Sequence, residues 1–299
     1  MSISDLALTQ TLANQLSTQA SNMANLQMQI SSGQALNQPS DNPAAVTQVL
    51  ALSSQAAQLT SYQSNAQSAT SWLGTANSTA NSALQIMSSA NTLLLQASSQ
   101  GSQNSSSYQA IGRQLQGMVS NLLQLANTQY DGRALFGGTS SNPTAYDSSG
   151  NYLGNADTPS VIIGAGAGAG QKVALSVPGS AMFGSGAANV FATLTNAANA
   201  LLTGTPSAAQ ISTAITALSG NVSSAEQASV VLGNATQEAS LANASLTTQL
   251  SNVRANSANL KGVNVAQATT QLTLDTTSYQ AALWAASKAI PETLMQFIA

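Results

Sequence analysis

Three aspartates near the middle of the chain, Asp131, Asp147 and Asp157, are the side chains that could do acid–base chemistry. The sequence contains no histidine and no cysteine, so the commonest general base and two of the commonest metal ligands are missing. None of the three aspartates has a partner base, and an aspartate in such a polar stretch usually caps a turn. The sequence therefore predicts no catalytic residues, no metal ligands and no cofactor. It favours a protein that is not an enzyme.

A glycine-rich stretch, GAGAGAG at residues 164–170, is a second candidate for chemistry because such loops can hold phosphate groups. It lacks the Gly-Lys-Ser/Thr ending of a phosphate loop, and no strand-to-helix context surrounds it. Short apolar runs flank it on both sides. We interpret it as the flexible loop of a β-hairpin.

The composition favours a protein that packs against copies of itself. The chain has 299 residues, of which 43% are hydrophobic and only 5% are charged. Its polar surface must therefore be built from Ser, Thr, Asn and Gln, which supply little electrostatic repulsion between copies. The absence of cysteine also suits a protein that assembles outside the cell, where stray disulfides would form.

Charge and hydropathy exclude several kinds of partner. Six basic residues are spread along the chain and the net charge is −3, so no basic patch exists and nucleic-acid binding is not expected. No apolar run approaches ~18 residues, so membrane insertion is not expected either. The N-terminus has neither the cationic region nor the apolar core of a cleaved signal peptide, so we expect any export to retain it.

Residues 1–30 are predicted to form a helix with an apolar stripe. The stripe alternates between four- and three-residue spacing, the heptad pattern of paired helices, and polar Gln19 fills its one vacant position. The helix could pack as an amphipathic helix on its own core, or as one half of a seam with a distant segment or another subunit. The stripe consists of Leu12, Leu16, Met23, Leu26 and Ile30.

The C-terminal part of the chain has the same kind of pattern. A long helix is predicted to run to residue 260, Gly262 interrupts it, and a second stripe follows at Leu272, Thr276, Tyr279, Leu283, Ala286 and Ile290. Neither end has the flanking charges that usually fix coiled-coil partners. We infer that the two ends pair with each other and with neighbouring subunits. The candidate assembly interface therefore comprises Leu12, Leu16, Met23, Leu26, Ile30, Leu272, Tyr279, Leu283 and Ile290.

A polar segment near the N-terminus, QISSGQALNQPSDNPAAV at residues 29–46, interrupts the helical pattern. Proline at the first position of a helix loses no hydrogen bond, and asparagine before it is a good N-cap. A negative charge near a helix N-terminus is favoured by about 0.3–1 kcal/mol. We expect a helix to end near residue 33, another to begin at residue 43, and an extended, ordered connection to join them. The residues that mark this connecting segment are Gly33, Pro39, Asp41, Asn42 and Pro43.

The fold class predicted from these patterns is mainly α. A long antiparallel helical bundle or coiled coil forms from both chain ends, with a small β-rich insertion domain at the midpoint. Residues 1–42 supply the N-terminal half of an inner helical core and the connecting segment, and residues 261–299 supply its C-terminal half. Residues 43–138 and 189–260 form the two halves of an outer helical domain, and residues 139–188 form the β-rich insertion.

Three segments of the chain resemble the flagellin superfamily. SSGQALNQPSDNPAAV at residues 31–46 resembles the family's SSG…PSDDP segment, and its Pro-Ser-Asp-x-Pro form is closer to the hook–filament junction proteins (third hook-associated proteins) than to flagellin. QLANTQYDGRALFGGTS at residues 124–140 is similar to LANTQFNGRYLFGGT of that family. LTLDTTSYQAALWAASKAI at residues 272–290 is similar to its C-terminal helix. Gln34 and Pro291 depart from the family pattern.

This resemblance implies a structural protein of the bacterial flagellum that forms the junction between hook and filament. It implies export through the flagellar secretion channel, an extracellular location, and terminal helices that order on assembly. The implied partners are copies of the chain in a ring-like homo-oligomer, a neighbouring hook-associated protein, flagellin, and a flagellar export chaperone. Flagellin itself, or another exported helical adhesin or effector, remains the alternative.

Overall fold

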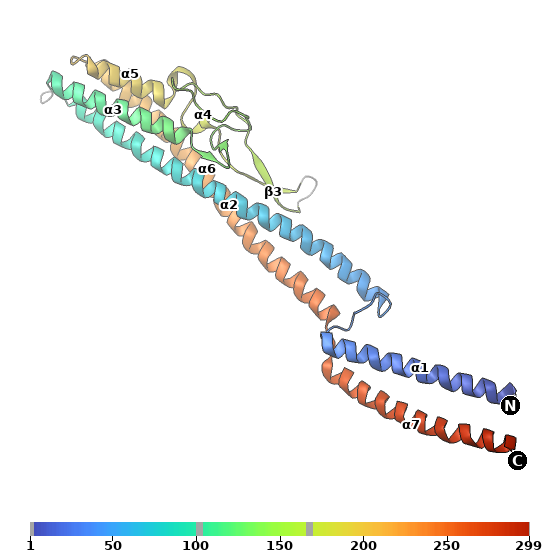
Figure 1. Cartoon of the computed structure of the whole chain (residues 1–299). Helices are drawn as coiled ribbons and strands as arrows, with labels where there is room; N and C mark the ends of the chain where they lie inside the picture. The colour runs from blue at the N-terminus through green and yellow to red at the C-terminus, as the bar shows by residue number, and fades with distance from the viewer. Residues whose placement is uncertain (1–2, 100–103, 166–169, 299) are drawn as a thin grey trace. The chain divides into compact units, whose positions relative to one another are not determined.

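The computed structural model describes residues 3–99, 104–165 and 170–298, with no description of the side chains at residues 3–6, 8, 9 and 288–298. The described chain is mainly helical, as the sequence predicts, and two small antiparallel sheets lie near its midpoint (Figure 1). It divides into two compact units. Unit 1 comprises Met1–Gln58 and Leu250–Ala299, and unit 2 comprises Leu59–Gln249.

Unit 2 is built on two long helices, α2 (Pro43–Ser98) and α6 (Ala208–Lys261), which also contribute residues to unit 1. Within unit 2 the two helices are linked by side-chain hydrogen bonds. Gln63 Nε2 donates to Thr247 Oγ1 at 2.9 Å, and Asn77 Nδ2 donates to Thr236 Oγ1 at 2.7 Å. Low residue numbers on one helix pair with high numbers on the other, so the two helices run antiparallel.

Alanine makes up just over half of the buried residues of α2 and just under half of those of α6. On α2 the fully enclosed alanines recur at heptad spacing, and α6 has a matching series. Small side chains let two helices approach closely, which large aliphatic residues would prevent. Leu50 and Leu95, which belong to the apolar pattern of α2, are instead 65% and 51% exposed. The enclosed alanines are Ala66, Ala76, Ala80, Ala83, Ala90 and Ala97 on α2, with Ala225 and Ala239 on α6.

Two shorter helices, α3 (Ser105–Ala126) and α5 (Val190–Leu202), pack against each other in unit 2. Their backbones approach closely at Gly112, where an added Cβ would lie 3.0 Å from the carbonyl oxygen of Ala198. Helix α3 ends at Ala126. Residues 129–134, which the sequence pattern places within the first half of the outer helical domain (residues 43–138), form a hairpin instead of helix, because Asp-Gly strongly favours a tight turn.

That hairpin consists of β1 (Gln129–Tyr130) and β2 (Arg133–Ala134). Its two central residues, Asp131 and Gly132, both have positive φ, at 51° and 73°. This is the geometry of a two-residue type I′ turn, whose twist matches that of the flanking strands. The turn therefore fixes Asp131 at the tip of the hairpin.

A second hairpin pairs β3 (Ser160–Gly164) with β4 (Gln171–Ala174), and the register shifts between Ile162 and Gly164. The glycine-rich loop predicted between them falls partly on residues 166–169, outside the described residues. A tight turn precedes these strands where Tyr146 bridges Tyr152. Hydrogen bonds from the Asn151 side chain, and from backbone N–H groups of that turn, hold the pKa of Asp147 below its ordinary value.

An aromatic cluster joins the β-rich region to the helices. Phe136, Tyr146, Phe183 and Phe191 are buried, and Phe183 lies 5.3 Å from Phe136 and 5.7 Å from Phe191 between ring centroids. Tyr146 Oη donates to the carbonyl of Gly184 at 2.8 Å, and burial raises the pKa of its phenol above the ordinary value. Helix α4 (Gly179–Met182) and the 3₁₀ turn η1 (Gly186–Ala188) connect this cluster to α5.

Unit 1 contains two further helices, α1 (Ile3–Ser32) and α7 (Val265–Ile298), which pack against each other (Figure 1). The sequence predicts both helices, including the break at Gly262 between α6 and α7. Among the described residues, no helix combines the length and the hydropathy that a membrane span requires.

Candidate assembly surface

The apolar stripe predicted on α1 is the side of that helix that is withdrawn from solvent. Between residues 10 and 30, the half-buried side chains are those at heptad spacing, together with one neighbour, Gln29. All other described side chains in that stretch are exposed. The stripe therefore faces α7, as a paired seam requires. Its members are Leu12, Leu16, Gln19, Met23, Leu26 and Ile30.

The stripe of α7 that is withdrawn from solvent differs slightly from the stripe that the sequence predicts. Leu272, Thr276 and Tyr279 are half-buried and Ala286 is buried, but Leu283 is 42% exposed and the smaller Ala282 is half-buried next to it. Ile290 belongs to the part of α7 whose side chains lie outside the described residues. The structure thus gives a seam of Ala268, Leu272, Asp275, Tyr279, Ala282 and Ala286.

Each stripe includes one strongly polar residue. The Oε1 atom of Gln19 is buried and has no hydrogen-bond partner among the described residues. On α7, Asp275 is half-buried, and its Oδ1 accepts a hydrogen bond from Gln271 Nε2 at 2.8 Å. A polar group in an apolar seam lowers the stability of the pair but favours one register over others.

A backbone bridge joins the residues that follow α1 to the junction between α6 and α7. Ala35 N donates to the carbonyl of Lys261 at 2.7 Å, and Val263 N donates to the carbonyl of Gly33 at 3.2 Å. Gln34 and Gly262 form an antiparallel bridge between these two contacts. Gly33 has φ of 69°, the left-handed conformation that commonly ends a helix. Both hydrogen bonds join backbone atoms, so they do not require a charged side chain at these positions.

The connecting segment between α1 and α2 is folded into turns rather than extended. Asp41 Oδ2 accepts hydrogen bonds from the backbone N–H groups of Asn37 at 2.9 Å and Gln38 at 2.8 Å. The carboxylate therefore closes the loop that contains Pro39. The Asp41 charge was expected to favour the helix N-terminus, but its nearest donors are these two N–H groups, which lie only three and four residues before it.

Helix α2 begins at Pro43, and Asn42 caps it as the sequence predicts. Asn42 Oδ1 accepts a hydrogen bond from the backbone N–H of Ala45 at 3.0 Å, and its carbonyl accepts from Val46 N at 2.9 Å. Proline at the first helical position has no N–H that would need a partner. The cap therefore satisfies the N–H of Ala45, one of the free donors in the first turn of the helix.

Replacing Asn42 with alanine is expected to lower the free energy of unfolding of unit 1 by about 1 kcal/mol, because the Ala45 N–H loses its acceptor. Chemical denaturation followed by far-ultraviolet circular dichroism measures the change. Asn42→Ser is the control, since serine caps about as well. Equal losses for both variants would mean that the cap contributes no stability here.

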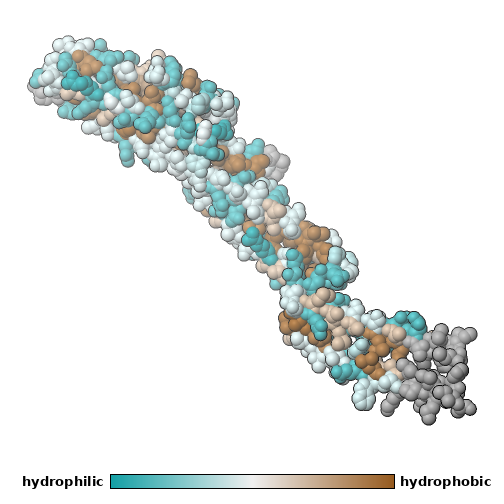
Figure 2. Space-filling view, in the orientation of Figure 1, coloured by the Kyte–Doolittle hydropathy of each residue, from teal (hydrophilic) through white to brown (hydrophobic). Residues whose placement is uncertain are grey.

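Large apolar side chains are exposed on the outside of α7. Trp284 is 74% exposed, Leu274 58% and Val265 48%, and α1 adds Met28 at 45%. A helix turns by about 100° per residue, so Trp284 lies on the side of α7 opposite Ala268 and Tyr279 of the seam. Apolar side chains also gather on the visible surface of the terminal helices in Figure 2. The side chains of Trp284 and Leu274 have no cover within the described chain, which makes this side of α7 a candidate for protein contact.

Comparison with known families identifies the first part of this arrangement. Residues 3–141 match the family model described as the bacterial flagellin N-terminal helical region. This part of the chain is similar to the N-terminal helical region of bacterial flagellin. This region covers α1, the connecting segment, α2, α3 and the first hairpin, so the resemblance seen at residues 31–46 and 124–140 is confirmed. The search of curated proteins found no match to this sequence.

Several solved structures share the fold. A proposed flagellar hook-associated protein from Vibrio parahaemolyticus aligns with a TM-score of 0.67 at 18% identity, over 74% of this chain and 100% of its own. Flagellar hook-associated protein 3 from Legionella pneumophila aligns with a TM-score of 0.60 at 13% identity, over 71% of this chain and 98% of its own. A structure of the flagellar junction protein FlgL from the same organism gives 0.57 at 12% identity, over 72% and 99%.

Proposed function

We propose that this flagellin-type chain is a structural protein of the bacterial flagellum that forms the junction between hook and filament. The observation that carries the proposal is the pairing of α1 with α7 along a heptad seam, with large apolar side chains left exposed on the outer face of α7. The similarity in fold to hook-associated proteins supports it.

In this function the terminal helices supply the contact surface between subunits. Packing Trp284 and Leu274 against a neighbouring copy would remove apolar surface from water, at about 25 cal/mol per Å². The 5% charge content leaves little like-charge repulsion to oppose close packing of identical surfaces. The assembled form is a ring-like homo-oligomer that contacts a neighbouring hook-associated protein on one side and flagellin on the other.

Export precedes assembly in this proposal. The chain leaves the cell through the flagellar secretion channel without loss of its N-terminus, held beforehand by an export chaperone. The polar groups at Gln19 and Asp275 make the α1–α7 seam weaker than an all-leucine seam, which suits ends that must stay unpaired during export and pair afterwards. Its location is then extracellular, in the flagellum.

Flagellin itself is the closest alternative, because the same terminal helices would serve in a filament. An exported adhesin or effector with a helical stalk is the more distant one. The hook–filament junction is preferred because the Pro-Ser-Asp-x-Pro motif at residues 39–43 and the aligned solved structures both favour hook-associated proteins.

Deletion of the gene tests this proposal directly. Cells lacking the protein should make hooks without filaments and release flagellin monomers into the medium, both visible by electron microscopy and immunoblotting. Re-expression of the wild-type chain should restore filaments. Loss of filaments without release of flagellin would instead favour the flagellin alternative, and normal filaments would overturn the flagellar role.

A further inference from the structure

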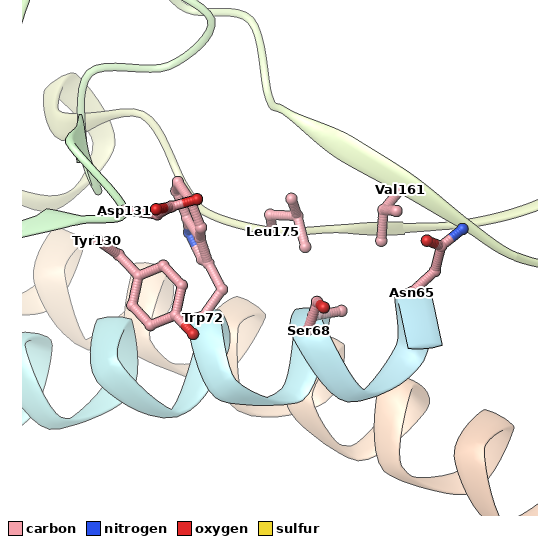
Figure 3. Close-up of a pocket in the computed structure, with 8 residues that line it drawn as sticks. Asn65, Ser68, Trp72, Tyr130, Asp131, Val161 and Leu175 are labelled. Carbon is pink, nitrogen blue, oxygen red and sulfur yellow. The ribbon is translucent and has the colours of Figure 1, made fainter. Parts of the chain in front are cut away.

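A pocket lies in unit 2 where the β-rich region covers α2 (Figure 3). Its volume is about 440 Å³, within the range of about 300–1,000 Å³ that is common for small-molecule sites. Trp72 and Tyr130 stand together at one end in Figure 3, and Asn65 lies at the other. The lining residues are Asn65, Ser68, Ala69, Trp72, Tyr130, Asp131, Val161 and Leu175.

The polar groups of this pocket are mainly hydrogen-bond acceptors. Asn65 uses its Nδ2 group to donate to the carbonyl of Ile162 at 2.8 Å, which leaves its Oδ1 atom as an acceptor. Asp131 is exposed, and its carboxylate has no hydrogen bond or ion pair among the described residues. No lysine or arginine lines the pocket, so Asp131 gives it a net negative charge. A ligand that fits should bring donors and a positive charge.

The apolar part of the pocket is aromatic and aliphatic. The rings of Trp72 and Tyr130 lie 5.1 Å apart between centroids and are tilted by 55°. Tyr130 is half-buried, and Trp72 is 9% exposed. The Nε1 atom of Trp72 is sealed from solvent and has no partner among the described residues, so packing alone holds this ring. An aromatic face beside a carboxylate attracts cations by both Coulomb and cation–π interactions.

We propose that this pocket binds a guanidinium or alkylammonium group, the group at the end of an arginine or lysine side chain. Its N–H donors are directed to the Asp131 carboxylate, and the carbon atoms that follow lie against Tyr130, Val161 and Leu175. A phosphate or carboxylate is excluded because the lining offers it no cation and one repelling charge. The inference does not depend on the proposed function.

The type I′ turn makes Asp131 suitable for a clean test. Asn-Gly favours this turn as strongly as Asp-Gly, so Asp131→Asn removes the charge and keeps the hairpin. Trp284 is the second tryptophan of the chain, and it belongs to unit 1. In a full-length Trp284→Phe background, the fluorescence of Trp72 therefore reports the pocket alone.

The experiment titrates this variant with ethylguanidinium and with ethylurea, a neutral molecule of nearly the same shape. Ethylguanidinium should change the Trp72 fluorescence saturably, with an affinity at least tenfold above that of ethylurea. Asp131→Asn should abolish that preference, while Asp157→Asn, which removes an exposed carboxylate elsewhere, should leave it intact. Equal binding of ethylurea, saturable binding of methyl glucoside that survives Asp131→Asn, or no saturable binding at all would each overturn the assignment.

The bound group could come from a second copy of this chain or from a different protein. Sedimentation velocity distinguishes these sources once the cation preference is established. Self-association that Asp131→Asn and Arg113→Gln both weaken would assign the group to a second copy, since Arg113 is exposed on α3. Self-association that is absent, or indifferent to both variants, would assign it to another protein.

Discussion

Cells that carry Leu26→Asp in place of the wild-type chain are expected to lose at least nine-tenths of their attached filaments, which corresponds to about 1.4 kcal/mol or more in the assembly contact. Leu26 is half-buried in the α1 seam, and a charge there must be taken out of water without a partner when the helices pair. The same loss is expected for Leu272→Asp on α7. Counting filaments by fluorescence microscopy, with protein levels matched by immunoblot, measures the effect.

Asn25→Asp is the matched control for these seam variants. It adds the same charge to α1, one residue away, on the exposed side of the helix. It should retain normal filament numbers, and the cooperative unfolding of unit 2 should be unchanged in all three variants. If Asn25→Asp abolished filaments as fully as Leu26→Asp, the negative charge itself and not the seam would be the cause.

Phe183→Ala is expected to lower the free energy of unfolding of unit 2 by about 3–5 kcal/mol, the usual loss when a large core aromatic is removed. The Phe183 side chain is fully buried and packs against Phe136, Tyr146 and Phe191. Near-ultraviolet circular dichroism during urea denaturation follows this cluster directly. Ile162→Ala provides the comparison. Ile162 is already 38% exposed, so its replacement should lower the free energy of unfolding by about 1 kcal/mol or less.

If Phe183→Ala lowered the free energy of unfolding only slightly, the neighbouring rings would have to move into the space that the phenyl ring leaves. A loss confined to the β-rich region, with α3 and α5 still helical, would mean that the cluster does not couple insertion and helices. We expect α3 and α5 to lose stability together with the β-rich region. Phe136 and Phe191 flank the insertion in sequence, and both contact residues within it.

The terminal seam was largely predictable from the sequence, because heptad spacing of large apolar residues is a direct signal of pairing. Every predicted α1 position from Leu12 to Ile30 is half-buried in the structure. On α7 the predicted position is Leu283, the larger of the two adjacent apolar residues Ala282 and Leu283. The structure buries the smaller one, which hydrophobicity alone does not predict.

The core of unit 2 was harder to predict for a related reason. Alanine is common in helices whether they are exposed or buried, so Ala76 and Ala80 gave no contrast with their neighbours. The hairpin at Asp131–Gly132 lies within residues 43–138, which the pattern assigns to a helical domain, although an Asp-Gly pair signals a hairpin. The aromatic cluster depends on contacts between residues far apart in sequence, which local patterns do not contain.

The backbone bridge between residues 33–35 and 261–263 also has a consequence for the order in which the chain folds. It closes a loop of roughly 230 residues, and the entropic cost of closing a loop rises with its length. Contacts nearer the midpoint, such as those between α3 and α5, close much shorter loops. Once the Asn77–Thr236 and Gln63–Thr247 contacts between α2 and α6 have formed, only a short length of chain remains between them and the bridge on each side. Folding should therefore proceed from the middle of the sequence towards both termini, so that α1 and α7 pair last and separate first.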